Sequence, residues 1–190
     1  MTTTTALRWT SADLETLPDD GKRYEIIEGE LYMSRSPHYE HQLTCSNITE
    51  FLGIWSRKTK LGQAVIGPGV IFADDDDVIP DVAWASRERR DEILDEDGHF
   101  HGAPELVIEV LSFTGSNARR DREAKLKLYS RRDVDEYWIL DWIARQIEVY
   151  RRGAFDLELT ATLESSDLLE SPLLPGFSCR VKDIFADYLV

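Results

Sequence analysis

The chain has 190 residues, 42% of them hydrophobic, and a formal net charge of −14 at pH 7. This length and apolar content suffice for one core, so we expect a single domain over residues 1–190. No stretch approaches the roughly 18 apolar residues of a membrane span, and the N-terminal segment MTTTTALRWT lacks the pattern of a signal peptide. We therefore expect a cytoplasmic protein with no membrane partner.

The charge balance restricts how the chain could bind nucleic acid. Lys and Arg total 22 against 36 Asp and Glu, and affinity for nucleic acid depends on neutralising phosphates with basic groups. A polyanion site must therefore be local or assisted by bound cations, for which clustered carboxylates are suitable ligands. Cys45 and Cys179 are far apart and predict neither a disulfide scaffold nor a metal-binding spacing.

The first third of the chain predicts a hairpin followed by a long helix. Residues 7–17 form a short amphipathic segment, and RYEIIEGELYMS (23–34) has the pattern of a hairpin with Glu28-Gly29 at its turn. Apolar residues recur at helical spacing over 37–61, and Gly62 is the expected end of this helix.

The middle of the chain alternates extended segments with polar ones. AVIGPGVIFA (64–73) is predicted to be extended with a bend at Pro68-Gly69, and VIPDVAWAS (78–86) to be a strand. The aspartate run 74–77 lacks the ligand pattern of a calcium loop, so we expect a solvated loop tip. The charged segment 87–102 is expected to lie on the surface.

The remaining segments complete a mixed β-sheet flanked by helices, an α/β or α+β fold of two or three layers. The predicted elements are a strand at PELVIEVLS (104–112), a helix at 116–131, a hairpin of EYWILDW (136–142) with RQIEVYRR (145–152), a strand at FDLELTATL (155–163), and a tail at 171–189 with a short helix.

Glu109 lies in the middle of an otherwise apolar strand. An ionised carboxylate without a partner is costly in an apolar interior. One explanation is a half-solvated strand face or a salt bridge. The other is a cation shared with Asp81, which begins the apolar run of its own strand, because Mg²⁺ is typically held by one or two carboxylates with water and substrate phosphate.

The two lysines of NARRDREAKLKLYS (117–130) differ in their surroundings. Leu128 and Tyr129 lie three and four residues after Lys125, so Lys125 shares the face expected to pack inward. Lys127 has polar neighbours and is expected to be solvated. The alternative for Lys125 is an ordinary surface ion pair with Asp121.

The order of these segments resembles the Uma-type family of restriction endonucleases, which is assigned to the PD-(D/E)XK nuclease fold. The resemblance extends from about Leu14 to Phe185. It rests on RYEIIEGEL, a helix carrying His41, IPDVAWAS, PELVIEVLS, DREAKLKLY, DVDEYWILD and SPLLPGF, in that order. The resemblance implies a restriction-endonuclease-like mixed sheet flanked by helices.

The resemblance also implies roles for individual residues. Asp81 and Glu109 would hold Mg²⁺, with Mn²⁺ as a substitute, and Lys125 would be the catalytic lysine. Glu25 matches a recurrent family position and would be a further acidic ligand or a support for Lys125. His41 matches a recurrent histidine, which is either structural or in contact with the site.

The chain departs from the plain nuclease motif in one position that bears on chemistry. The standard lysine lies two residues after the acid, where this chain has Leu111. The resemblance implies that the following helix supplies the lysine instead. Phe113 and Asp133 also replace the family's usual proline and glycine, outside the expected site.

The function implied is metal-dependent hydrolysis of phosphodiester bonds, with DNA as the expected partner and a homodimer as the simplest assembly. Arg119, Arg120 and Arg122 are the expected phosphate-binding residues, because they flank a helix start where backbone N–H groups also favour anions. The alternative is a catalytically silent nuclease-fold protein that acts as a binding or assembly module. The net charge and Leu111 favour this alternative.

Overall fold

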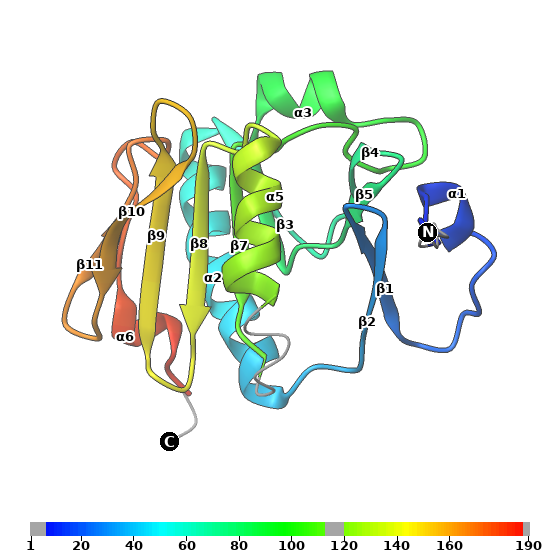
Figure 1. Cartoon of the computed structure of the whole chain (residues 1–190). Coiled ribbons are helices and arrows are strands. Elements are labelled where there is room, and N and C mark those ends of the chain that lie inside the picture. Colours follow the sequence, from blue (N-terminus) through cyan, green and yellow to red (C-terminus); the bar gives the residue numbers. More distant parts are fainter. Residues whose placement is uncertain (1–6, 113–119, 188–190) are drawn as a thin grey trace.

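The computed structural model describes residues 7–112 and 120–187. Its largest sheet has six strands in the order β10-β9-β8-β7-β6-β3. These strands are β3 (Gly62–Ile66), β6 (Val82–Ser86), β7 (Leu106–Val110), β8 (Glu136–Asp141), β9 (Gln146–Arg152) and β10 (Leu157–Leu163). β7 and β8 pair in parallel, whereas the other neighbours pair antiparallel. The structure is thus the mixed sheet flanked by helices that the sequence predicts (Figure 1).

Helices cover both faces of this sheet, which explains why its central strands are apolar on both sides. All five residues of β7 and the first five of β8 are buried. The long helix α2 (Tyr39–Thr59) packs on one face, and α5 (Leu126–Arg131) lies on the other (Figure 1). A parallel strand pair requires a crossover connection, and α5 belongs to the crossover between β7 and β8.

Successive side chains along the strands point to opposite faces of the sheet and pack in two separate hydrophobic cores. Ile108 and Trp138 pack with Ile48 and Leu52 of α2 in the first core. Val107 and Ile139 face the other way and pack with Leu128 and Tyr129 of α5 in the second core. This alternation places Glu109, which has the same parity as Val107, on the α5 side of the sheet.

A second sheet of four strands, in the order β2-β1-β5-β4, stands beside the first. Its strands are β1 (Arg23–Ile27), β2 (Glu30–Ser34), β4 (Val70–Ala73) and β5 (Asp76–Val78). The predicted hairpin is confirmed, with Glu28 and Gly29 both at positive φ in the turn between β1 and β2. Both central residues of a type I′ turn have positive φ, which matches the twist of the flanking strands.

The expectation of a fully solvated aspartate loop at 74–77 is wrong for Asp76. Asp76 begins β5, is fully buried, and pairs with Arg131 and Arg132 at the end of α5. Its Oδ1 also accepts a hydrogen bond of 2.8 Å from the backbone of Glu28. A buried carboxylate needs such partners, and the two arginines lie more than fifty residues away from Asp76 in the sequence.

The end of α2 also differs from the prediction. The helix ends at Lys60, which adopts the left-handed conformation with φ 61°. Gly62 instead begins β3, where a Cβ would lie 2.3 Å from the carbonyl oxygen of Ala85 and 2.4 Å from the Trp84 ring. The role of Gly62 is therefore to let β3 approach β6 closely, because glycine has no Cβ. It does not end the helix.

Segment 87–102, which was expected to lie on the surface, contains a helix and two buried residues. It begins with α3 (Arg87–Ile93), which Ser86 caps, and it buries Ile93 and Phe100 in the second core. The amphipathic start of the chain contains the short helix α1 (Ser11–Leu14). β11 (Leu168–Glu170) precedes the tail, which contains β12 (Ser178–Arg180) and α6 (Val181–Ile184). Asn47 of α2 donates to backbone oxygens on and after α6.

The helix predicted at 116–131 is helical over its described part. Within the described residues, Arg120 is helical, the π-helical turn η1 (Asp121–Lys125) follows, and the helix continues as α5. π-Helical turns inside helices are rare and are frequent at functional sites. In the described part of the chain, no helix combines the length and apolar composition needed to cross a membrane.

Candidate active site

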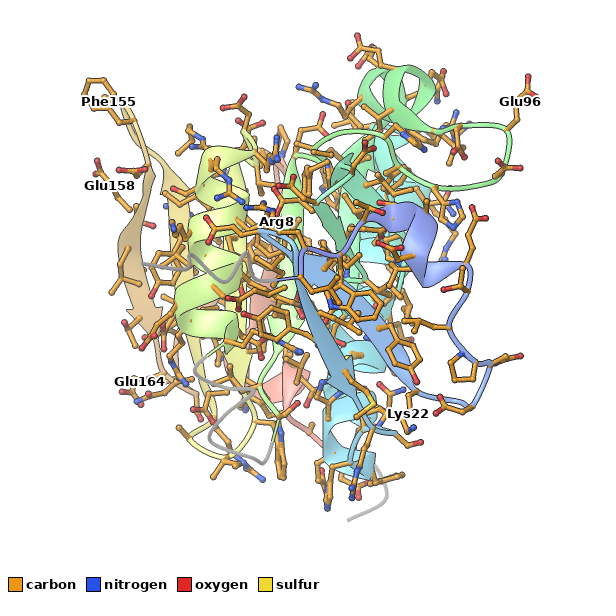
Figure 2. All side chains as sticks on the ribbon, turned by 45° about the vertical axis from the view of Figure 1, so that its right-hand side comes forward. Arg8, Lys22, Glu96, Phe155, Glu158 and Glu164 are labelled. Atoms are coloured by element: carbon orange, nitrogen blue, oxygen red, sulfur yellow. The ribbon has the colours of Figure 1, made fainter. Side chains whose placement is uncertain are left out.

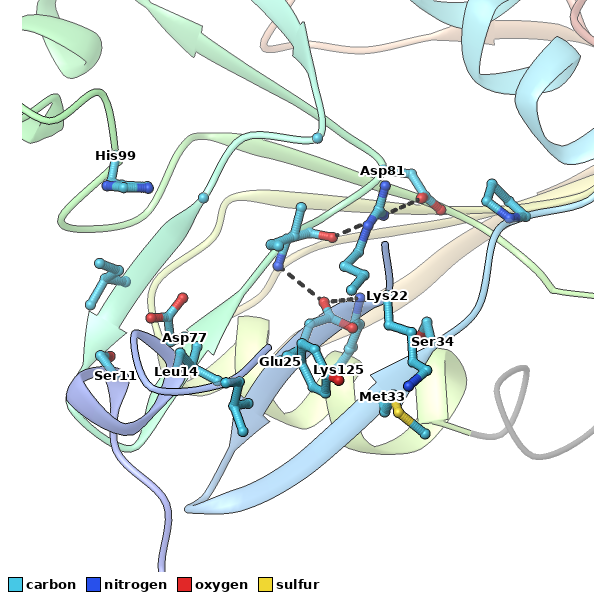
Figure 3. A pocket seen from close by; sticks show the side chains of 18 of the residues that line it. Ser11, Leu14, Lys22, Glu25, Met33, Ser34, Asp77, Asp81, His99 and Lys125 are labelled. Carbon is cyan, nitrogen blue, oxygen red and sulfur yellow. Dashed lines mark hydrogen bonds and ion pairs between the residues drawn. The ribbon is translucent and has the colours of Figure 1, made fainter. Parts of the chain in front are cut away.

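A cleft of about 1780 Å³ lies between the two large sheets. Five acidic or basic side chains that are largely withdrawn from solvent line its floor, namely Glu25, Asp81, Glu109, Asp121 and Lys125. They come from β1, the residue immediately before β6, β7 and η1. Figure 3 shows Glu25 and Lys125 pointing toward one another, with Asp81 farther along the same cavity.

Lys125 connects two of these carboxylates. Its Nζ lies 2.7 Å from Oε1 of Glu109 and 2.8 Å from Oε1 of Glu25. Burial opposes the charge on this ammonium, but the carboxylates of Glu109 and Glu25 outweigh burial and hold the pKa of Lys125 above its ordinary value. Lys127, two residues later, is exposed and pairs with Glu28, so the predicted difference between the two lysines is confirmed.

Among Asp81, Asp121 and Glu109, the carboxyl group of Glu109 has the most strongly raised pKa. Burial is the main cause that raises its pKa to about 8, with Asp81, Asp121 and Glu25 adding to the effect and Lys125 opposing it. Tyr129 donates a hydrogen bond of 2.8 Å to the same Oε1 that Lys125 contacts. Burial thus opposes ionisation of this carboxyl group, whereas the Lys125 ammonium favours it.

Asp81 faces Glu109 across the strand pair. Val82 pairs with Ile108 in the antiparallel register of β6 and β7, and one further step places Asp81 opposite Glu109. Oδ2 of Asp81 accepts a hydrogen bond of 2.9 Å from the backbone of Val110. Burial alone would raise the pKa of Asp81, but His41, Lys125 and this backbone donor lower it to about 2. Asp81 is thus ionised.

Two basic side chains hold the Asp81 carboxylate. Nε2 of His41 lies 3.2 Å from Oδ2, and a guanidinium nitrogen of Arg23 lies 3.1 Å from Oδ1. Burial lowers the pKa of His41, yet contact with Asp81 outweighs burial and leaves that pKa above its ordinary value. On its other side, Nδ1 of His41 lies 3.6 Å from Sγ of Cys45, one helical turn along α2.

Asp121 and Arg120 occupy the wall beside Lys125. Asp121 is 2% exposed, and burial together with nearby acids raises its pKa to about 6. Its Oδ1 has no hydrogen-bond partner and lies 3.5 Å from Nε of Arg120. Arg120 also reaches Oε2 of Glu25 at 3.5 Å and Oγ of Ser34 at 3.2 Å.

Most of the residues singled out from the sequence meet in this cleft. The structure brings together the side chains of Glu25, His41, Asp81, Glu109, Arg120 and Lys125. Arg122 instead pairs with Asp141 and Glu148 on β8 and β9, away from the cleft lining. Arg119 lies outside the described residues.

The structure adds three residues that the sequence reasoning did not select. Arg23 shares a face of β1 with Glu25, and strand alternation could have revealed it. Cys45 lies four residues after His41, so helical spacing could have revealed it as well. Asp121 was considered only as a surface partner of Lys125, because nothing in the sequence marks a π-helical turn.

The comparisons agree with this fold. The model of the Uma2 family, described as "Putative restriction endonuclease", matches residues 11–182. The chain therefore belongs to this family of restriction-endonuclease-like proteins. The structure is also similar to the crystal structure of a putative nuclease belonging to DUF820 from Anabaena variabilis. That similarity has a TM-score of 0.75 at 20% sequence identity and covers 93% of this chain and 97% of the other. None of the curated proteins searched matches the chain.

Proposed function

We propose that this protein is a metal-dependent endonuclease that hydrolyses phosphodiester bonds in DNA. The observation that carries the proposal is the placement of Asp81 opposite Glu109 on neighbouring strands, with Lys125 at 2.7 Å from Glu109 in one cleft. Membership of a restriction-endonuclease-like family supports the same conclusion.

The donor set fits a hard divalent cation. Asp81 and Glu109 offer carboxylate oxygens, which Mg²⁺ and Mn²⁺ prefer, and both line the open cleft from which water and phosphate would complete the coordination. The buried acids also outnumber the buried cations around them, which is consistent with the raised pKa of Glu109. When bound, such an ion would polarise a phosphate oxygen and lower the pKa of a bound water.

The chain's own residues position the reacting groups. Glu25 holds the Lys125 ammonium toward Glu109, where Nζ can donate to an attacking water or to a phosphate oxygen that gains charge. His41, Arg23 and the backbone of Val110 orient the Asp81 carboxylate. Arg23 is one-third exposed at the side chain, so it can also contact a phosphate from within the cleft.

A binding or assembly module without catalysis is the second candidate. The net charge of −14 favours this function, because it repels DNA outside any local cation site. The ion pairs that already occupy Lys125 and Asp81 also favour a closed, structural cluster.

A homodimer, which would place two sites on the two strands of a duplex, is part of the first proposal.

Titration with Mn²⁺ tests the metal site, and a cleavage assay on the same proteins then distinguishes the two candidates. We would follow heat of binding and melting temperature for the wild type, Glu109→Gln and Lys127→Gln. Glutamine keeps the shape of Glu109 but removes a ligand charge, and Lys127 is an exposed control next to the buried lysine. A formed site raises the melting temperature of the wild type and the control by mass action, and Glu109→Gln loses most of this rise.

DNA cleavage is then measured with Mg²⁺ on the same proteins. The proposal predicts cleavage by the wild type and the Lys127→Gln control, and none by Glu109→Gln. Equal Mn²⁺ binding by the wild type and Glu109→Gln, or no binding by either, would contradict the proposed metal site. Metal binding without cleavage of DNA would instead favour the binding module.

A further inference from the structure

We infer that His41, Cys45 and Asp81 form a second cation position, which takes a thiophilic ion such as Zn²⁺ and which competes with the hard cation for Asp81. The ion binding is independent of the proposed function, whereas its inhibitory effect rests on that function. The inference starts from three buried side chains that offer an imidazole nitrogen, a thiol sulfur and a carboxylate oxygen within 4.8 Å of one another.

Their geometry is close to that of a metal-ligand set. Nδ1 of His41 lies 3.6 Å from Sγ of Cys45, and Nε2 lies 3.2 Å from Oδ2 of Asp81. Two ligands of a tetrahedral Zn²⁺ lie about 3.5 Å apart, given Zn–N and Zn–S distances of roughly 2.0 and 2.3 Å. Because Nδ1 faces Cys45 and Nε2 faces Asp81, and only one ring nitrogen can serve as the ligand, the imidazole would rotate when one ion is held by all three side chains.

The helix that carries two of the donors makes the set rigid. His41 and Cys45 are four residues apart on α2 and therefore lie on the same face, one turn from each other. The next residues on this face, Ile48 and Leu52, are anchored in the first core. Asp81 is fixed from the opposite side by the backbone of Val110. The three donors thus need little ordering on binding.

The donor chemistry selects a class of ion different from that of the nuclease site. A thiolate, an imidazole and a carboxylate suit Zn²⁺ and Co²⁺, whereas Mg²⁺ prefers oxygen ligands only. The thiol proton is released to solvent when the sulfur binds the metal. His41 and Asp81 line the cleft, so an ion can enter from the cleft and keep a fourth, open position filled by water.

Asp81 is a ligand both in the proposed site for a hard cation and in this second cation position. Binding of an ion at the second position should therefore affect activity. An ion held by His41, Cys45 and Asp81 would occupy an oxygen of the Asp81 carboxylate, which would then be withdrawn from a hard cation shared with Glu109. The inference therefore predicts that Zn²⁺ inhibits Mg²⁺-dependent cleavage and that Cys45 sets the concentration at which it does so.

Absorption spectroscopy with Co²⁺ alone tests the binding. Co²⁺ bound to a thiolate absorbs in the near ultraviolet, so the band reports the Cys45 contact directly. We would titrate the full chain as wild type, Cys45→Ser, His41→Gln and Cys179→Ser. Cys179 is the matched control, because it is the second buried free cysteine and lies on β12.

The expected result is a band in the wild type and in Cys179→Ser that Zn²⁺ removes and Mg²⁺ does not. Cys45→Ser loses the band and His41→Gln weakens Co²⁺ binding at least about tenfold. Circular dichroism and the melting temperature check that each variant is folded. No band in the wild type, or the same band in Cys45→Ser, overturns the inference.

A second readout separates this inference from the proposed function. If the Co²⁺ band depends on Cys45 but no preparation cleaves DNA, the cation position stands and the nuclease proposal fails. If Mg²⁺-dependent cleavage is seen without a Cys45-dependent band, the nuclease proposal stands and this inference fails. When both hold, Cys45→Ser needs at least about tenfold more Zn²⁺ for half inhibition than Cys179→Ser.

Discussion

Lys125 and Glu25 form a buried ion pair that connects the two large sheets of the molecule. Nζ of Lys125 lies 2.8 Å from Oε1 of Glu25 on β1, and the same nitrogen lies 2.7 Å from Glu109 on β7. One ammonium group therefore neutralises a carboxylate of each sheet at the floor of the cleft. The pair stabilises the fold whatever chemistry the cleft performs. Its loss can therefore be measured as a decrease in the free energy of unfolding.

Replacing Lys125 by methionine should destabilise the protein by about 3–5 kcal/mol, because removal of one partner leaves a buried charge uncompensated. Lys127→Met, at the exposed neighbouring lysine, should change stability by less than about 0.5 kcal/mol. Urea unfolding at pH 7 measures both. Adding Glu25→Gln to Lys125→Met should recover part of the loss, and strict additivity of the two changes would argue against the pair.

Asp76 provides a second buried carboxylate whose partners are known. Asp76→Asn should cost about 2–3 kcal/mol, since it weakens charge-assisted hydrogen bonds to Arg131, Arg132 and the backbone of Glu28. The neighbouring Asp75 has an exposed side chain, and Asp75→Asn is the matched control with an expected change below about 0.5 kcal/mol. Equal effects in the two variants would contradict the assigned network.

The pH dependence of stability should carry a contribution from Asp121. Burial raises its pKa from 3.8 to about 6, so between these values the folded protein holds a proton that the unfolded chain has released. The free energy of unfolding therefore falls as pH rises through this window, by roughly 3 kcal/mol from this group. Asp121→Asn should remove that part of the fall in urea unfolding between pH 4 and pH 7. Parallel pH profiles for both proteins would show that Asp121 does not titrate in this way.

Two glycines should respond to alanine in opposite directions. Gly62→Ala should destabilise the protein by about 3 kcal/mol, because the new Cβ would overlap the Ala85 carbonyl and the Trp84 ring. Gly53 lies inside α2 and has only the flexible end of Arg57 nearby. Gly53→Ala should therefore stabilise the protein by about 0.5–1 kcal/mol. Thermal unfolding of the two variants checks the prediction, and a stabilised Gly62→Ala would contradict the close approach of β3 and β6.

Local patterns explain how much of the fold the sequence could predict. The hairpin at 23–34, the helix over most of 37–61 and the hairpin of β8 and β9 follow from periodicity and turn residues that act over a few positions. The end of α2 at Lys60 could not be predicted in this way. Lys60 ends the helix in a left-handed conformation, and Gly62 is needed for the close approach of β3 to Trp84 and Ala85 of β6, a contact that no local pattern specifies.

In the candidate site, too, local patterns predict only the features that depend on residues close together in the sequence. Lys125 could be separated from Lys127 because its neighbours Leu128 and Tyr129 lie on its own helix. Asp76 was misjudged because the run 74–77 is locally polar, while its arginine partners are more than fifty residues away. The contact between His41 and Asp81 likewise depends on how α2 packs against β6, which no local pattern specifies.

The turn between β9 and β10 offers a practical attachment point. Its Phe155 side chain is 89% exposed, and Figure 2 shows it projecting at the far edge of the molecule from Lys22, which lines the cleft. Such exposed turns are the sites where proteins best accept insertions. A fluorophore or surface tether placed at this turn would leave the cleft open, so that ion and nucleic-acid binding can be followed on immobilised protein.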